Sequence, residues 1–221
     1  MNGHIVQDHF RKLRDRYPNI VLCFEKDKYF VRGEINFRAQ YQENEIINVA
    51  YEVEIEISGN YPVSPPIARE LAGDIPETFH TFLDGTLCLG APLAIKEKFS
   101  TDPTLVGFVE NLLVPYLYSF KCLSHKGELP FGELEHNAEG ILNYYMDLFH
   151  VTEPIIALRF LYLLANEKVR GHLPCPCGEG AIIRKCHAPI LKRIQEYQTP
   201  FEFGWELNYC YKYFKAMRGY K

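Results

Sequence analysis

Two groups of residues in this sequence have side chains whose types and spacing could do chemistry. In the first group, Cys88 follows the turn-forming pair Asp84-Gly85, and His80 lies eight positions before it. A cysteine just beyond a turn can be partly exposed, and its thiolate is a nucleophile that a nearby imidazole can activate. The segment therefore predicts a catalytic Cys88 assisted by His80. A cysteine between two leucines is also an ordinary core residue, which is the alternative.

The second group is a run of metal-ligand side chains near the carboxyl terminus. Cys175, Cys177, Cys186 and His187 supply three thiols and one imidazole, with glycines between the two pairs that permit tight turns. That number and type of ligands is typical of a closed tetrahedral zinc site, in which no position is left for water. We therefore predict a structural Zn²⁺ site here. A redox pair formed by the Cys-x-Cys dipeptide is the alternative interpretation.

Composition limits the function classes that the chain can serve. The 221 residues are 47% hydrophobic and carry a net charge of −4, so we expect a packed core and no general attraction to nucleic acid or to an anionic membrane. No apolar run reaches the roughly 20 residues of a spanning helix. Seven cysteines, three of them crowded together, suit a reducing compartment. The expected location is the cytoplasm.

The pattern of apolar residues predicts an α+β fold. Residues 4–16 have helical spacing, and residues 20–24, 29–37 and 51–57 alternate as strands of an antiparallel meander. In the last of these strands, every second residue from Tyr51 to Ile57 should be buried, and the three glutamates between them should be exposed. The proline-rich segment 59–67 that follows cannot form a central strand, so we expect a rigid packed loop.

The second half of the chain is predicted to be mainly helical. A long, mostly irregular passage should run to Ser100, and a helix should then begin at Asp102, its cap, with Pro103 in its first turn. Pro115 should kink or end that helix. Further helices are expected over 138–150, over 153–168, and in the aromatic tail, where Cys210 should be a core residue.

The order of these elements, with two motifs, resembles the ubiquitin-conjugating (E2) family. The family's Tyr-Pro-x-x-Pro-Pro motif after the third strand is matched by Tyr61-Pro62-Val-Ser-Pro65-Pro66, and its Gly-x-Ile-Cys-Leu element is matched by Gly85-Thr-Leu-Cys88-Leu. The resemblance covers residues 1–122. The His-Pro-Asn tripeptide of the eukaryotic family is absent, and His80 stands at the position of its asparagine.

This resemblance implies a UBC-like catalytic domain over residues 1–150, followed by a helical extension over 151–221 whose zinc knuckle is similar to the SEC-C motif. It implies that Cys88 accepts an acyl group as a thioester and passes it to an amine. His80 would then donate a hydrogen bond to the oxyanion or act as a base, and His125 and Asp102 are further candidates for positioning the amine. Because the chain has no Gly-rich phosphate loop, an E1-like activating enzyme or its equivalent should supply the activated acyl group.

The knuckle, His80 and the segment from Pro130 to Tyr145 resemble prokaryotic E2-like proteins of antiviral conjugation systems. In such systems the acyl donor is a ubiquitin-like protein or, in CBASS, a cGAS-like nucleotidyltransferase, and the sequence does not separate these two settings. The rival interpretation is a non-catalytic E2 variant that serves as a scaffold through its zinc tail. A zinc protein that binds nucleic acid is a third interpretation, which the acidic composition disfavours. No membrane partner is expected.

Overall fold

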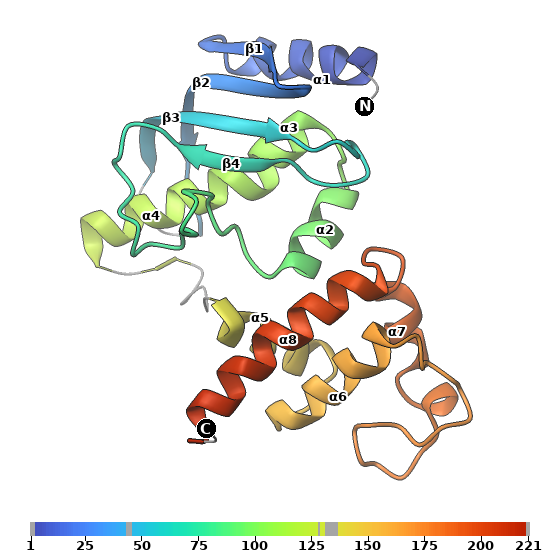
Figure 1. Cartoon of the computed structure of the whole chain (residues 1–221). Helices are drawn as coiled ribbons and strands as arrows, with labels where there is room; N and C mark the ends of the chain where they lie inside the picture. Colours follow the sequence, from blue (N-terminus) through green and yellow to red (C-terminus); the bar gives the residue numbers. More distant parts are fainter. Residues whose placement is uncertain (1–2, 43–45, 128, 131–136, 220–221) are drawn as a thin grey trace. The chain divides into compact units, whose positions relative to one another are not determined.

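The structure is a computed structural model, and it describes residues 3–42, 46–127, 129–130 and 137–219 (Figure 1). The chain divides into two compact units. Unit 1 comprises Met1–Leu89 and Ala94–Glu133, and unit 2 comprises Gly90–Leu93 and Leu134–Lys221. Each unit has its own buried apolar core. Unit 1 contains an antiparallel sheet and both units contain helices, so the expected α+β class is confirmed.

The sheet of unit 1 is a simple meander of four strands in the order β1-β2-β3-β4. Its strands are β1 (Ile20–Glu25), β2 (Lys28–Ala39), β3 (Ile47–Ile57) and β4 (Ile67–Glu70). Along β3, the side chains that were expected to face the core are buried, and the three intervening glutamates are exposed or partly exposed. The alternating pattern therefore predicted the first three strands correctly, and it also predicted which face of the sheet is exposed to solvent.

The segment between β3 and the second half of the chain differs from the expectation in two places. Strand β4 pairs with β3 directly after Pro65-Pro66, where only a loop was predicted. Helix α2 (Pro92–Ser100) replaces the last part of the predicted irregular passage. Its buried residues Leu93 and Phe99 are six positions apart and lie on different sides of a helix, so no apolar stripe marks this helix in the sequence.

The helices of unit 1 cover the buried face of the sheet. Helix α1 (Gly3–Arg16) contacts β1, as its apolar spacing predicted, and α4 (Val114–Lys126) contacts β3 (Figure 1). The helical stretch before α4 starts as α3 (Leu105–Phe108). Its cap is Thr104, whose hydroxyl accepts a hydrogen bond from the Gly107 N–H at 2.9 Å. The predicted start at Asp102 was therefore wrong by two residues.

Pro115 does not end this helical stretch. A π-helical turn, η1 (Val109–Leu113), joins α3 to α4, and Pro115 lies in the first turn of α4. A proline lacks the N–H that continues a regular ladder, and a π turn immediately before it is one way in which a helix absorbs that loss. The chain thus remains helical from Leu105 to Lys126 with one local change of winding.

Unit 2 is built from helices around an aromatic core. They are α5 (Asn137–Leu148), α6 (Pro154–Ala165), the 3₁₀ turn η2 (Ile183–Lys185), α7 (Ala188–Ile194) and α8 (Pro200–Met217). Helix α8 packs against both α5 and α6, and Cys210 is fully buried there, as predicted. Helix α5 packs with α6 and α8 and belongs to unit 2, as does the short stretch Gly90–Leu93, whereas the expected domains were residues 1–150 and 151–221. Within the described residues, no helix has the length and apolar character needed to cross a bilayer.

Candidate functional site

The loop that carries Cys88 is fixed by backbone hydrogen bonds to the free edge of β4. Leu87 N–H donates to Ala68 O at 2.8 Å, and Thr86 forms an isolated antiparallel bridge with Arg69. On its other side the loop doubles back, and Cys88 N–H donates to His80 O at 2.6 Å. These bonds hold the main chain of Thr86, Leu87 and Cys88 to β4 on one side and to His80 on the other, and Cys88 itself is partly exposed. An accessible thiol on a fixed backbone can react as a nucleophile.

The turn before Cys88 is stabilised by Asp84. Its carboxylate accepts a hydrogen bond from Thr86 N–H at 3.0 Å, and this bond, together with the nearby Arg69 guanidinium, lowers the pKa of Asp84. Arg69 also donates to Glu54 and Glu56 on β3, at 3.4 and 3.2 Å. The side chain of Arg69 therefore links the open face of the sheet to this turn. Asp84 itself has the turn-forming role that its position before Gly85 indicated.

The main chain of His80 is hydrogen-bonded to that of Cys88, and the His80 ring packs against aromatic side chains. The residue is only 6% exposed, and its ring centroid lies 4.4 Å from that of Phe79 and 6.4 Å from that of Tyr116, both in edge-on geometry. Its φ of +44° is in the left-handed region, which few non-glycine residues adopt. Such a conformation persists only where the surroundings enforce it, and it is found often at functional sites.

Tyr116 is a member of this site that the sequence did not indicate. From α4, its hydroxyl is within hydrogen-bonding distance of two loop carbonyls, Phe79 O at 3.0 Å and His80 O at 3.3 Å. Burial raises the pKa of Tyr116 well above its ordinary value, so the hydroxyl remains a donor. The residue is far from the loop in sequence and resembles any other core tyrosine, so no sequence pattern identifies it.

The two other candidates named for this site have ordinary structural surroundings. Asp102 accepts a hydrogen bond from the Thr104 hydroxyl at 2.9 Å, next to the start of α3. His125 is exposed near the end of α4. These observations do not connect Asp102 or His125 with Cys88, so a role for the two residues in positioning an amine remains a prediction.

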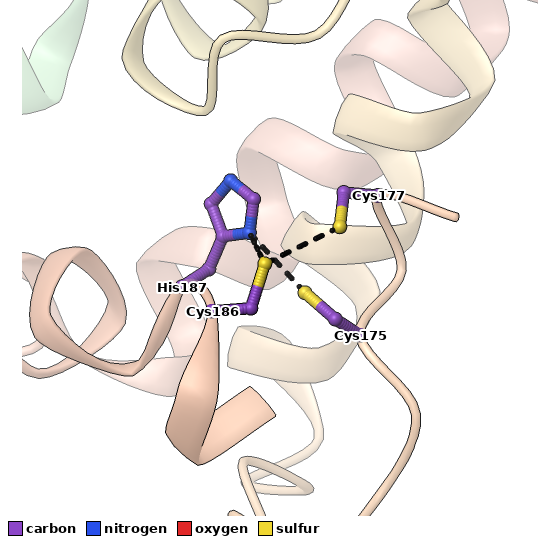
Figure 2. Close-up of side chains that lie close together, drawn as sticks. All are labelled: Cys175, Cys177, Cys186 and His187. Atoms are coloured by element: carbon purple, nitrogen blue, oxygen red, sulfur yellow. Dashed lines mark hydrogen bonds between the residues drawn. The ribbon is translucent and has the colours of Figure 1, made fainter. Parts of the chain in front are cut away.

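The four predicted metal ligands converge on one point in unit 2 (Figure 2). A short hairpin positions them: Cys175 N–H donates to Ala181 O at 2.8 Å, and Ile183 N–H donates to Leu173 O at 2.9 Å. The turn of this hairpin uses Gly178 and Gly180 with φ of +86° and +77°, values that favour glycine. Cys175 and Cys177 approach from one arm, and Cys186 and His187 approach from the other.

The distances between the donor atoms suit a tetrahedral metal ion. His187 Nδ1 lies 3.2 Å from Cys175 Sγ and 3.1 Å from Cys186 Sγ, and Cys177 Sγ lies 3.5 Å from Cys186 Sγ. All four donors lie within 4.8 Å of one another. Metal–ligand bonds of about 2.0–2.3 Å place tetrahedral donors about 3.3–3.8 Å apart. This group could therefore hold a metal ion with only small adjustments.

The second nitrogen of His187 orients the ring for this role. Nε2 lies 2.9 Å from Phe149 O, and a carbonyl can only accept, so Nε2 carries the proton. The lone pair is then on Nδ1, which faces the thiols. The ring also packs against Phe160 and Phe149, with centroids 4.9 and 6.1 Å away. Such an outer hydrogen bond fixes the tautomer and direction of a metal-ligating histidine.

The thiols themselves disfavour three negative charges in the absence of a cation. Burial raises the pKa of Cys175, and burial together with the neighbouring thiols raises that of Cys186 to about 12. For Cys177, burial also acts upward, but the Glu179 N–H and the other two thiols lower the pKa overall. Cys177 therefore loses its proton more easily than the other two thiols, and a divalent ion would stabilise the thiolate form of all three.

His136, Glu139 and His150 have side chains that could also bind a metal, but His136 lies outside the described residues, as do residues 131–136 of the segment from Pro130 to Tyr145 that enters the family resemblance. His150 is exposed on the turn after α5. Among the described residues, the Cys175 group is the cluster whose geometry suits a metal.

Comparisons with known proteins add no family assignment. No protein-family model, curated protein or solved structure matches this chain.

Proposed function

We propose that this protein is an E2-like cysteine acyltransferase with Cys88 as its nucleophile. The observation that carries the proposal is the partly exposed Cys88 thiol on a loop whose backbone is bonded to β4 and to His80. The order of a helix, three antiparallel strands, a proline-rich loop, a fourth strand, this cysteine loop and then helices is the order that a UBC-like fold would have. Both motifs of the resemblance fall at the matching places in that order.

The proposed reaction has two acyl-transfer steps. The Cys88 thiolate attacks the carbonyl carbon of an acyl group held by an activating enzyme, a new C–S bond forms, and the thiolate of the activating enzyme leaves. An amine then attacks the Cys88 thioester, an amide bond forms, and Cys88 leaves as thiolate while the amine loses a proton to a base. His80 supplies either an oxyanion donor or that base, and Tyr116 and Asp84 hold the loop in place.

We propose that the metal group binds Zn²⁺ in a structural role. Three thiols and one imidazole are its preferred closed ligand set, and no ligand position would be left for a reactive water. The Cys175–Cys177 redox interpretation is less well supported, because a dithiol pair requires neither the third thiol nor the oriented imidazole that converge on the same point.

The partners that we propose follow from the resemblance. The acyl donor is the carboxyl terminus of a ubiquitin-like protein or of a cGAS-like nucleotidyltransferase, activated by an E1-like enzyme, in bacterial antiviral defence in the cytoplasm. The alternative, a non-catalytic E2 variant that acts as a scaffold through the zinc tail, would need no reactive thiol at position 88.

A thioester assay separates the enzyme from the scaffold. The protein is incubated with ATP, the activating enzyme and each candidate donor, and the products are run on non-reducing and reducing gels. We expect a reductant-sensitive adduct that Cys88→Ala abolishes. Cys23→Ala is the matched control, because Cys23 is the other partly exposed cysteine of unit 1, and it should leave the adduct intact. An adduct that survives in Cys88→Ala would refute the assignment of the nucleophile.

A further inference from the structure

The outward face of α8 carries large aromatic side chains: Phe201 and Trp205 stay out of the core of unit 2, and Tyr209 packs against that core only in part. Phe201 is 83% exposed and Trp205 is 53% exposed, and Tyr209, one more helical turn along, is partly exposed. Residues spaced by four lie on one side of a helix. The opposite side of α8 buries Phe203, Glu206 and Cys210. Monomeric surfaces rarely line up large aromatics in this way without a partner.

The same face becomes basic toward the end of the helix. Lys212 continues the line of Phe201, Trp205 and Tyr209, and Lys215 lies beside it one turn further on. Between Leu207 and Gly219 the sequence contains no acidic residue. The outward face of α8 therefore has an aromatic first half and a cationic second half.

We infer that this face of α8, which we call the aromatic–basic stripe (Phe201, Trp205, Tyr209, Lys212 and Lys215), is a docking surface for an acidic amphipathic helix of a partner protein. Apolar side chains of that helix would cover the aromatic half, and its carboxylates would meet the two lysines. Trp and Tyr are the residues that most often dominate the energy of protein interfaces, and helices commonly dock through such a line of anchors. The inference rests on unit 2 alone and is independent of the proposed chemistry at Cys88.

The arrangement of the rings favours a protein partner over nucleic acid. Trp205 and Tyr209 stack on each other, with centroids 5.3 Å apart and planes 18° from parallel. Faces that are paired in this way are less available for bases, which bind single-stranded nucleic acid proteins by stacking on open rings. Exposed edges and a flat apolar side remain, and these suit aliphatic side chains.

The charge of the stripe also argues against a membrane surface. A surface-lying helix is usually flanked by cations along its whole polar side, whereas the first turn of α8 contains Glu202, which closes a capping box with Thr199. The cations are confined to one end, and a partner with carboxylates at one end is the better complement.

The only tryptophan of the chain lies in this stripe, so its fluorescence reports the proposed site directly. The probe is a synthetic helical peptide of about 15 residues, the length that spans Phe201 to Lys215. It has leucines at helical spacing in one half and glutamates on the same face in the other half. A second peptide has lysines in place of the glutamates. We expect the glutamate peptide to shift the Trp205 emission to shorter wavelength, and the lysine peptide to bind at least tenfold more weakly.

Two substitutions test the halves of the stripe separately. Phe201→Ser and Lys212→Glu should each weaken binding of the glutamate peptide by about tenfold. Lys192→Glu on α7 and Tyr162→Ser on α6 are matched controls, because both side chains are exposed and lie outside the stripe, and they should leave the affinity unchanged. Far-UV circular dichroism of each variant verifies that α8 is still folded.

Several results would overturn the inference. One is an unchanged Trp205 emission with the glutamate peptide on the unmodified chain, and another is equal binding of the two peptides. A shift produced by anionic vesicles or by a single-stranded oligonucleotide, but not by the glutamate peptide, would assign the stripe to those partners instead. A dimer of this chain that Phe201→Ser dissociates would assign it to self-association.

Discussion

Removal of one metal ligand should open the knuckle of unit 2 and leave unit 1 folded. The substitution is Cys175→Ser, which keeps the size of the side chain but replaces the most buried of the four ligand atoms with a poor zinc ligand. The knuckle spans 13 residues from Cys175 to His187. Few of its side chains are fully buried: within the described part of the chain these are Cys175 and Ile183, and the partly buried His187 ring packs against Phe149 and Phe160.

The size of the effect follows from these few contacts. Ordering 13 residues costs at least about 13 kcal/mol of backbone entropy at about 1 kcal/mol each. Burial of Ile183 and Cys175 returns only about 4 kcal/mol. The remaining gap, about 9 kcal/mol, is close to the lower end of the apparent 10–16 kcal/mol that a structural zinc ion supplies. Without the ion the knuckle should therefore be largely unfolded.

Two measurements follow the opening. Native mass spectrometry should find one zinc ion per chain in the unmodified protein and none in Cys175→Ser. Limited trypsin digestion should cleave the variant much faster after Arg184 and Lys185, which lie between the two ligand pairs in the 3₁₀ turn. Cys210→Ala is the control, because this buried thiol of unit 2 is outside the ligand group and its loss should not release zinc. Full zinc content and the parental rate of cleavage in Cys175→Ser would refute the reasoning.

Two further predictions concern single buried residues. If an N–H at position 80 assists the oxyanion, His80→Ala should slow transfer from the Cys88 thioester by about 10²–10³. His80→Asn should retain most of the rate, because asparagine tolerates the left-handed φ and keeps a hydrogen-bond donor. Equal rates of the two variants in single-turnover transfer to an amine would exclude this role. Burial and nearby Glu206 raise the pKa of the Cys210 thiol from 9.0 to about 12, so the folded state keeps a proton that the unfolded state loses as pH rises above about 9. This linkage is worth up to about 4 kcal/mol, fully present below pH 9 and lost toward pH 12. Urea unfolding between pH 8 and 11 should therefore show a shallower loss of stability in Cys210→Ala, and parallel slopes would contradict the prediction.

Elements with a strong repeating pattern could be predicted from the sequence, and elements fixed by distant contacts could not. The alternation along β3 and the apolar spacing of α1 each record which side is buried, and the structure agrees. Strand β4 has only four residues, and its identity depends on pairing with β3, which a short run of sequence does not encode. Thr104, not Asp102, is the N-cap of α3, because the Thr104 hydroxyl accepts a hydrogen bond from the Gly107 N–H. Both residue types are good N-caps, so the sequence cannot decide between positions two residues apart.

The two candidate sites differ in the same way. Ligand spacing along one short hairpin predicted which four side chains of the knuckle converge, because local turns alone bring them together. The surroundings of Cys88 combine a loop, an edge strand and a helix, so the tyrosine that contacts the His80 carbonyl had no local signal. The outer partner of His187, the Phe149 carbonyl, was also unpredictable, since any residue type could supply it.

Because of the π turn η1, the number of residues between the Thr104 cap and Tyr116 determines which side chain of α4 faces the loop before Cys88. A π turn amounts to one extra residue in an otherwise regular helix, and each residue rotates the following side chains by about 100°. The extra residue therefore sets the rotation at which α4 presents Tyr116 to the loop before Cys88. Related chains with one residue fewer in this turn would keep the same motifs around their cysteine and yet direct a different side chain of α4 at its loop.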